Sequence, residues 1–550
     1  MAVAMSMRTA KRSGGWVLVS LLTAALAPAA ERTVDRLQSE ARGFYLLWSQ
    51  EKPDAEQILG LPFMTGGQIV LQWGEVEPAR GRYDFSAIDA ALARFAKLDK
   101  WTTLQVNGNL KPAWLFDAVP HVKEKLSEQV RDTAGTLMFW HPVFQDAYLA
   151  MLGALAQHLQ ASPHRARLLG LRLNFNAIGT EHFAVPPELR EPGGWIWPAG
   201  AKREGGAALS PAVQEAYIDR VVAAYDRLFA DWATVFVRNN ISDELRAKYA
   251  DKFARGRLAF FHTSSEAEPR SAGLERQYGA FYDFCRSGQT VGYAEPWASA
   301  WGEHGGMIDV RWCSPAQWNY WTMLLNLHCG VSFIGEYYVN LHYAVSGQHG
   351  RDTAANPRTD GPREFMAAYE WGGRYVGRHN RPAESPGAWV AFRENPRAKA
   401  DNPKVLAKGR TLQRFTGDYT WLAARVGGSD GSIGVGPVGP PEQRYGAFAR
   451  KYPPGRSARV RLDPEFVHSL NGDTVVRVIA LGEAAATLKV GAAEFQIDAS
   501  PQRWRVSEFH LPAARLQAAS GEAQVEVRAG ERDLILHLVE VQRGDGRLSP

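Results

Sequence analysis

Cysteine is scarce in this chain of 550 residues, which contains three copies of it. The three residues, Cys285, Cys313 and Cys329, form no CxxC pair, and an odd number cannot all be paired within one chain. Neither a disulfide framework nor a cysteine zinc site is therefore indicated. The spacing is compatible with one disulfide and equally with none.

Several motifs that mark other functional classes are also missing. No Asp/His cluster has metal-ligand spacing, and no GxSxG nucleophile elbow stands between an expected strand and helix. No metal and no organic cofactor is therefore expected. Nothing resembles a nucleic-acid-binding motif or a basic helix, so nucleic acid is not an expected partner.

Long hydrophobic runs are absent except at the N-terminus. Arg8, Lys11 and Arg12 precede the apolar run "WVLVSLLTAALA", and small residues follow it. This pattern predicts a signal peptide over residues 1–29 and a secreted or periplasmic protein with no membrane segment after cleavage. The alternative is an uncleaved anchor, for which the run is short. Removing the three basic residues lowers the net charge from +5 to +2, which gives little support for a polyanionic partner.

Residues 37–385 alternate short apolar runs with segments of helical period. This alternation predicts an α/β fold, a (β/α)8 TIM barrel. A doubly wound sheet is the rival, but no glycine-rich phosphate loop follows the first expected strand. The expected strands are "GFYLLW" (43–48), "QIVLQW" (68–73), "TTLQVNG" (102–108), "LGLRLNFN" (169–176), "ATVFVRN" (233–239), "RLAFFHTS" (257–264), "QTVGYAEPW" (289–297) and "VSFIGEYY" (331–338).

The sequence pattern changes over residues 386–550, where short runs of alternating apolar and polar residues are separated by turns rich in Gly, Pro and Asp. Such runs predict an all-β sandwich of jelly-roll type, with an accessory or carbohydrate-binding role. The runs are "AWVAFRENP", "TWLAARVG", "RYGAFARKY", "TVVRVIALG", "RWRVSEFHL", "AQVEVRAG" and "LILHLVEVQ".

Carboxylates follow three of the expected barrel strands. Glu181 follows the fourth strand, Glu295 ends the seventh and Glu336 ends the eighth. The C-terminal ends of barrel strands form one face, where TIM-barrel active sites lie. Two opposed carboxylates there are what glycosidic bond cleavage requires: one attacks the sugar or activates water, and the other protonates the leaving oxygen.

Aromatic and amide side chains surround the same strand ends. Of 18 tryptophans, 15 precede residue 386, and indole rings stack on the CH faces of sugars. Glu77 is expected to brace the barrel rim through an arginine, and the segment 185–206 to form a wall of the cleft. The expected substrate-binding residues are Asn176, Glu336, Trp297, Trp301, Trp73, Asn107, His262 and Trp114.

The stretch "LQWGEVEPARGRYDFSAIDAALARFAK" (71–97) resembles the second-strand region of clan A retaining glycoside hydrolases. The resemblance extends over the barrel and implies retaining hydrolysis of an oligo- or polysaccharide. In that clan the acid/base glutamate ends strand four and the nucleophile ends strand seven, which correspond to Glu181 and Glu295 here. The C-terminal region is similar to the accessory jelly-roll modules appended to such enzymes.

One departure from the clan concerns the acid/base position. The clan usually has Asn directly before that glutamate, whereas Asn176 and Glu181 are five residues apart. Either a loop returns Glu181 to the cleft, or the site is altered. The alternatives are therefore a carbohydrate-binding protein without catalysis, Glu336 as nucleophile, and a lyase or esterase. The hydrolase interpretation requires Glu181 to face inward and is weakened if an arginine neutralises Glu295.

Overall fold

The computed structural model describes most of the chain, and its described residues belong to one compact unit. These residues are 37, 39–49, 52–201, 207–238, 241–263, 285–286, 291–296, 300, 313–348, 361–394, 417–428, 430–519 and 522–544. The predicted signal peptide lies outside them. Among them, no helix is both long and apolar enough to cross a membrane.

Eight parallel strands close into a barrel in the order β1-β10-β9-β8-β7-β6-β3-β2, with β1 pairing β2. The predicted barrel is confirmed, because each strand overlaps one of the eight expected apolar runs. The strands are β1 (Gly43–Leu47), β2 (Met64–Gln72), β3 (Trp101–Asn107), β6 (Leu168–Arg172), β7 (Thr234–Arg238), β8 (Leu258–Thr263), β9 (Gly292–Glu295) and β10 (Phe333–Tyr337).

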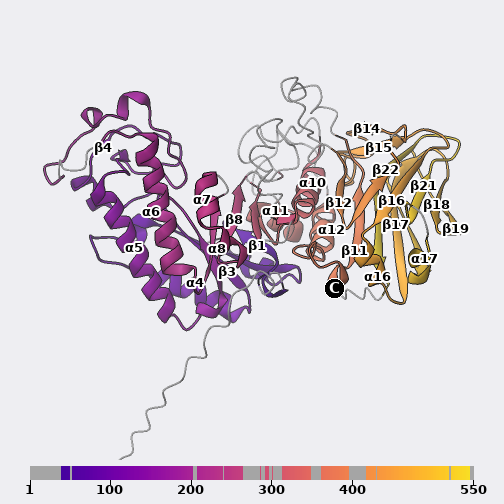
Figure 1. Cartoon of the computed structure of the whole chain (residues 1–550), viewed down its shortest axis with the longest axis horizontal. Helices are drawn as coiled ribbons and strands as arrows, with labels where there is room; N and C mark the ends of the chain where they lie inside the picture. The colour runs from indigo at the N-terminus through magenta and orange to yellow at the C-terminus, as the bar shows by residue number, and fades with distance from the viewer. Residues whose placement is uncertain are drawn as a thin grey trace, which may run out of the picture. The chain divides into compact units, whose positions relative to one another are not determined.

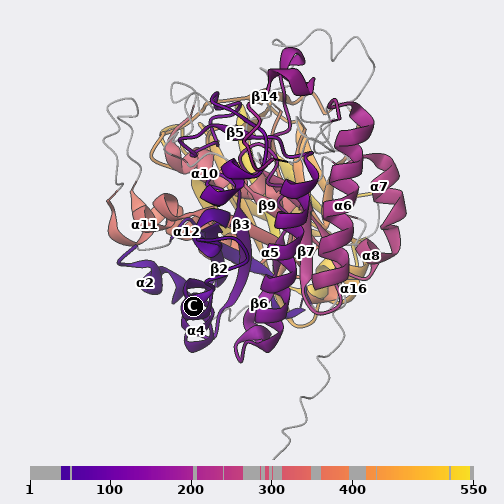
Figure 2. The same cartoon turned by 90° about the vertical axis from the view of Figure 1, so that its left-hand side faces the viewer.

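Helices follow the strands in the β–α repeat that Figure 1 colours from indigo to salmon. Ser210 caps the N-terminus of α6 through its side chain, and Ser314 and Gln317 form a capping box on α10. Figures 1 and 2 both show α5 and α6 lying side by side. The helices are α2 (Ala55–Leu59), α3 (Trp73–Val76), α4 (Ser86–Lys97), α5 (Pro142–Ala161), α6 (Pro211–Phe229), α7 (Asp243–Lys248), α8 (Ala250–Ala254), α10 (Pro315–His328), α11 (Tyr338–Ser346) and α12 (Pro362–Gly373).

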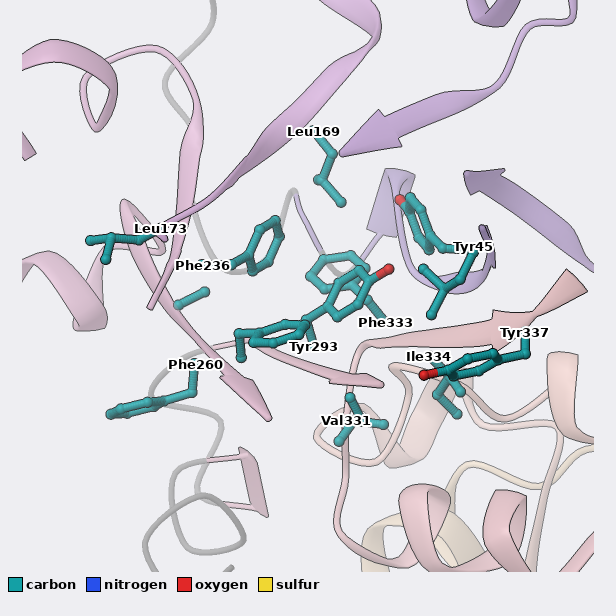
Figure 3. Packing of buried hydrophobic residues seen from close by; sticks show 14 of the residues in the cluster. Tyr45, Leu169, Leu173, Phe236, Phe260, Tyr293, Val331, Phe333, Ile334 and Tyr337 are labelled. Atoms are coloured by element: carbon teal, nitrogen blue, oxygen red, sulfur yellow. The ribbon is translucent and has the colours of Figure 1, made fainter. Parts of the chain in front are cut away.

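Aromatic side chains fill the barrel interior. Tyr293 of β9 packs against Tyr45, Phe236 and Phe333 with ring centroids 5.3–6.3 Å apart (Figure 3). Each of these rings is at most 2% exposed. The layer is therefore a packed floor beneath the C-terminal ends of the strands, as in other barrels of this architecture.

Strand alternation decides which way the carboxylates of β9 and β10 point. Tyr293 points into the barrel, so Glu295, two residues on, shares that direction. Phe333 of β10 also points inward, so Glu336, three residues on, lies on the opposite face of the strand, toward the outer helices. There it accepts a hydrogen bond of 3.2 Å from the Tyr369 hydroxyl of α12.

The C-terminal region contains two antiparallel sheets, one of seven strands and one of five. Apolar residues of both sheets contribute to one core, including Val390 and Val476 of the first sheet and Val460 and Val527 of the second. The all-β prediction is thereby confirmed, while the sandwich stays a prediction. The first sheet contains β11 (Gly387–Ala391), β12 (Tyr419–Trp421), β14 (Ile433–Val435), β15 (Ala449–Tyr452), β17 (Asp473–Gly482), β20 (Arg505–Pro512) and β22 (Leu534–Arg543); the second contains β13 (Ala423–Val426), β16 (Ser457–Leu462), β18 (Ala486–Val490), β19 (Ala493–Ile497) and β21 (Val525–Arg528).

A buried carboxylate joins the barrel helices to the first of these sheets. Glu540 of β22 is fully buried and accepts a hydrogen bond of 2.8 Å from the Trp371 indole of α12 and another from the Tyr375 hydroxyl. Arg477 of β17 completes the set with a contact of 2.9 Å to Glu540. Such a charge is tolerated in an interior only because each oxygen is satisfied.

The three cysteines are all buried and none is in a disulfide. Burial raises the pKa of the Cys329 thiol to about 12 and also raises that of the Cys285 thiol well above its usual range. Both groups are therefore neutral thiols at physiological pH, which makes them unreactive packing residues.

Replacing Glu540 with alanine is expected to lower the free energy of unfolding by about 3–5 kcal/mol, because Arg477 and two polar hydroxyl or indole groups lose their buried partner. The matched control is Glu508→Ala, which removes the more exposed partner of the same Arg477 and is expected to lower it by less than about 1 kcal/mol. Urea unfolding followed by tryptophan fluorescence measures both. Equal effects of the two substitutions contradict the interpretation.

Glu336 generates a pH-dependent prediction. Burial raises its pKa from 4.5 to about 8, although hydrogen bonds with Tyr369 and Asn340 act in the opposite direction. The folded state therefore holds a proton that the unfolded state releases, and stability falls as the pH rises from about 4.5 toward about 8. Glu336→Gln removes this loss.

The free energy of unfolding of Glu336→Gln relative to the natural chain is accordingly expected to increase between pH 5 and pH 8. Urea titrations of both proteins at the two pH values measure the difference. A difference that does not change with pH shows that Glu336 is ionised in the folded state.

Candidate active site

Polar side chains replace the aromatic floor at the C-terminal ends of the barrel strands. Gln105 of β3, Arg172 of β6, Arg238 of β7 and Glu295 of β9 each stand at or near the end of their strand. Glu295 is 3% exposed and Arg172 is 8% exposed. The barrel mouth therefore contains a buried charged layer directly above its apolar interior.

The loop after β6 carries Glu181 back to this layer. Asn176 and Gly179 both adopt left-handed backbone conformations, with φ values of 52° and 58°, which turn the chain sharply. The Asn176 amide then donates to the Thr180 carbonyl at 3.0 Å, and Ile178 pairs with His182. The sequence left two explanations for the spacing between Asn176 and Glu181, a loop that returns Glu181 to the cleft or an altered site. In the structure the loop turns back and Glu181 lies at the barrel mouth.

Gln129 and Thr180 anchor this loop. The Gln129 side-chain carbonyl accepts hydrogen bonds from the backbone amides of Thr180 and Glu181 at 3.0 and 3.1 Å. The Thr180 hydroxyl donates to Asn109 at 2.5 Å and accepts from the Gly108 amide. Hydrogen bonds of the Gln129 side chain and of the Thr180 hydroxyl therefore fix the backbone at Glu181.

One guanidinium connects the two predicted catalytic acids. Arg172 Nη1 lies 3.1 Å from Glu295 Oε2, and Arg172 Nη2 forms an ion pair with Glu181 Oε1. Gln105 accepts a further hydrogen bond of 3.1 Å from Nη1, and the Arg172 guanidinium lies 4.0 Å from the centroid of the Phe261 ring. Both carboxylates therefore contact this one group.

A second arginine binds the other oxygen of Glu181. Arg238 Nη1 forms an ion pair with Glu181 Oε2, so this carboxylate contacts two guanidinium groups. Burial lowers the pKa of Arg172 to about 10 and also lowers the pKa of Arg238, while the Glu295 charge opposes both shifts. Both arginines therefore remain protonated at neutral pH.

The two expectations about the acids thus have different outcomes. Glu181 does face inward, with a side-chain exposure of 12%. Glu295 is also inward but is paired with an arginine of the barrel wall, which is the condition that weakens the hydrolase interpretation.

Asparagines form an amide network beneath the loop. Asn174 donates to the Asn107 side-chain oxygen at 2.9 Å, and both Asn174 and Asn176 donate to the Val106 carbonyl. Asn107 is 4% exposed and Asn176 is fully buried. These hydrogen bonds of Asn107 and Asn176 support the loop, and the contact of either residue with a sugar stays a prediction.

Lys111 ties the same loop to the strand-three segment. Its ammonium donates to the carbonyls of Gly108 and Gly179, and burial lowers its pKa to about 8 in spite of the nearby Asp132. This lysine stabilises the turn that presents Glu181.

Trp73 corrects the expected set of sugar platforms. It is fully buried against Phe144 and Tyr148, and its indole donates to Glu77 at 2.8 Å, so it has no face for a sugar. Glu77 is structural as expected, but its partners are this indole and the Gly81 amide rather than an arginine. Trp73 was expected to bind a sugar because it directly follows a strand. Its ring instead packs against Phe144 and Tyr148 of α5.

The other predicted binding residues are placed as follows. Trp114 is partly exposed, with the Arg80 guanidinium 5.1 Å from its ring centroid, and stays a candidate platform. His262 is buried, and Glu336 contacts the outer helices rather than the acid pair. Trp297 and Trp301 lie outside the described residues.

The segment 185–206, expected as a cleft wall, is described through residue 201. Trp195 is 5% exposed, packs edge-on against Trp140 and donates to the Leu189 carbonyl. Ile196 pairs with His121 of β4 (His121–Val122). The segment is therefore fixed to the N-terminal end of α5, and its role as a wall stays a prediction.

A Ser–His–Asp chain, which an esterase requires, lies apart from this site. His342 Nδ1 contacts Asp54 at 2.5 Å, and its Nε2 lies 3.3 Å from the Ser346 hydroxyl. However, Ser346 donates to the carbonyl of His342 at 2.8 Å and stands at the last turn of α11, where the helix dipole opposes a developing oxyanion. We interpret the set as a tie between α11 and the segment before α2.

Arg172 is the residue that sequence reasoning missed. The sequence feature that could have identified it is a charged side chain at the end of the otherwise apolar strand "LLGLR" (β6). An arginine on a buried strand needs an anionic or hydrogen-bonding partner in the interior. Within the described residues, no group of three or more His, Cys, Asp or Glu side chains could hold a metal ion.

Comparison with known proteins matches part of the barrel. The glycoside hydrolase 42 family model, described as beta-galactosidase, matches residues 67–168. Beta-galactosidase BbgII of Bifidobacterium bifidum is 29% identical over 100 residues, which are 17% of this chain and 14% of that protein. The chain thus matches a small part of its curated relative, and the family match over residues 67–168 does not include Glu181 or Glu295.

Solved structures with a similar course of the backbone include two glycosidases. The catalytic domain of beta-amylase from Paenibacillus polymyxa has a TM-score of 0.38 and 11% identity, covering 61% of this chain and 98% of that one. A catalytic mutant of the family 42 beta-galactosidase Gan42B from G. stearothermophilus has a TM-score of 0.38 and 15% identity, covering 63% and 59%.

The family match runs from β2 to the first residue of β6 and includes the β2–α4 region, where the sequence resembles clan A enzymes. The chain's resemblance to the TIM-barrel glycosidase superfamily is therefore confirmed.

Proposed function

We propose that this chain is a glycoside hydrolase that cleaves an oligo- or polysaccharide with Glu181 and Glu295. The observation that carries the proposal is the shared guanidinium: the Glu295 carboxylate of β9 and the Glu181 carboxylate of the loop after β6 meet at Arg172, at the end of the barrel where such enzymes react. The family match to beta-galactosidases over residues 67–168 supports the same reaction class.

Glu295 is the proposed nucleophile. It stands on a strand, is 3% exposed and has one carboxylate oxygen held 3.1 Å from Arg172, so its side chain is fixed in the position from which it would attack an anomeric carbon. Glu181 is the proposed acid/base, since it lies on a loop at the mouth, where a leaving group departs.

Net retention is part of the proposal, as the resemblance to clan A enzymes implies. Retaining enzymes hold their two carboxyl groups about 5–5.5 Å apart, whereas inverting enzymes leave about 6.5–9.5 Å for a water molecule. The shared contact with Arg172 brings both acids to the same end of the barrel, which retention requires.

The substrate proposed for first tests is an aryl β-galactoside, in line with the description of the matching family. Export by the predicted signal peptide is part of the proposal, as is a sandwich arrangement of the C-terminal sheets. Together these place the substrate, a glycan, outside the cytoplasm and assign residues 386–550 an accessory role beside the catalytic domain at 37–385.

A second candidate is a carbohydrate-binding protein without catalysis. The observation that favours it is the pair of arginines on Glu181, because an acid held ionised by two cations is a poor proton donor. Glycan binding without turnover supports this candidate.

Glu295→Gln is expected to lower kcat by several orders of magnitude, because an amide cannot form the glycosyl-enzyme intermediate. Thermal melting is expected to show a folded protein, since the amide still accepts a hydrogen bond from Arg172. The matched control is Glu128→Gln, an exposed acid near the same loop, which is expected to leave the rate unchanged. Near-normal turnover by Glu295→Gln assigns the nucleophile elsewhere, and Glu336 is then tested first.

The stereochemical course tests the role of the shared guanidinium. Proton NMR during hydrolysis of an aryl glycoside is expected to show the product first with the anomeric configuration of the substrate. Initial formation of the opposite anomer shows that the acids separate enough to admit water, and overturns retention while leaving the reaction class intact.

A further inference from the structure

The barrel mouth presents two arginines to two carboxylates. Arg172 and Arg238 both contact Glu181, and Arg172 also contacts Glu295. Burial lowers the pKa of both arginines, but both remain positively charged at physiological pH. The four groups form a balanced network in which each acid has a cationic partner.

This balance conflicts with the chemistry of an acid/base residue. The residue that protonates a leaving oxygen must itself carry a proton, and such acids are kept protonated by apolar or like-charged surroundings. Two guanidinium contacts have the opposite effect. A productive complex therefore needs one of the two arginines to leave Glu181.

Arg172 is fixed too firmly to be that arginine. It bonds Gln105 and Glu295 and packs on the Phe261 ring, and its side chain is 10% exposed. Arg238 is the more accessible cation, with a side chain that is 26% exposed at the end of β7. Its planar fork matches the geometry of a carboxylate, for which a second anion can compete.

We propose that the substrate is an acidic sugar whose carboxylate binds Arg238 and leaves Glu181 with Arg172 as its cationic partner. This inference rests on the proposed function and names the substrate class for the same site. A hexuronic acid residue supplies the needed group, because its carboxylate replaces the hydroxymethyl of a neutral hexose. Binding of an acidic sugar thus removes one of the two arginines from Glu181 and makes it easier for this residue to take up a proton. A neutral sugar has no carboxylate to compete for Arg238, so both arginines stay in contact with Glu181.

Matched pairs of aryl glycosides test the inference on the full chain. We expect kcat/KM to be about 100-fold higher for an aryl glucuronide or galacturonide than for the corresponding glucoside or galactoside, which is the range of a charge-assisted hydrogen-bond pair. Arg238→Met is expected to abolish this preference, and Arg238→Lys to keep part of it. Arg220→Met, which removes an exposed arginine paired with Asp146, is the control and is expected to change nothing.

A binding measurement separates this inference from the proposed function. Calorimetry with Glu295→Gln compares glucuronate and galacturonate with glucose and galactose. Uronate binding that requires Arg238, without turnover by the natural chain, supports the substrate class and overturns hydrolysis. Equal or faster turnover of the neutral glycosides overturns the substrate class and leaves hydrolysis standing. Absence of both uronate binding and turnover overturns both, and thermal melting confirms that each variant is folded.

Discussion

The contact of one guanidinium with two carboxylates organises the centre of this protein. Arg172 stands at the end of a buried strand, where an unpaired cation would be strongly disfavoured. Its partners come from a different strand and from a loop, so the ion pairs form only when the barrel has closed and the loop after β6 has turned back. The charged layer therefore forms only in the correctly folded barrel.

The same network bears on the proposed reaction in two opposite ways. Both acids that the proposal names contact one guanidinium, and this cation reduces the repulsion between them. Glu181, however, also contacts a second arginine. An enzyme with this site depends on its substrate to rearrange the charges, and a binding protein does not.

Buried charges recur where other parts of the chain meet. Glu540 joins α12 to β22 and β17, and Glu336 lies between β10 and the outer helices. The first contacts an arginine, whereas the second accepts a hydrogen bond from the Tyr369 hydroxyl and has a raised pKa because it is buried. Carboxylates of similar burial thus have different partners, a cation for Glu540 and a hydroxyl for Glu336.

Local pattern determined the barrel, the strand ends that carry Glu181 and Glu295, and the all-β region that follows, because apolar period and turn residues are properties of short segments. Tertiary structure decided the rest. Trp73 became core rather than platform because α5 covers it, and Glu181 reached the mouth because Asn176 and Gly179 adopt left-handed conformations. The pairing with Arg172 and Arg238 joins residues of β6 and β7 to a loop and to β9, and no spacing along the chain encodes such contacts.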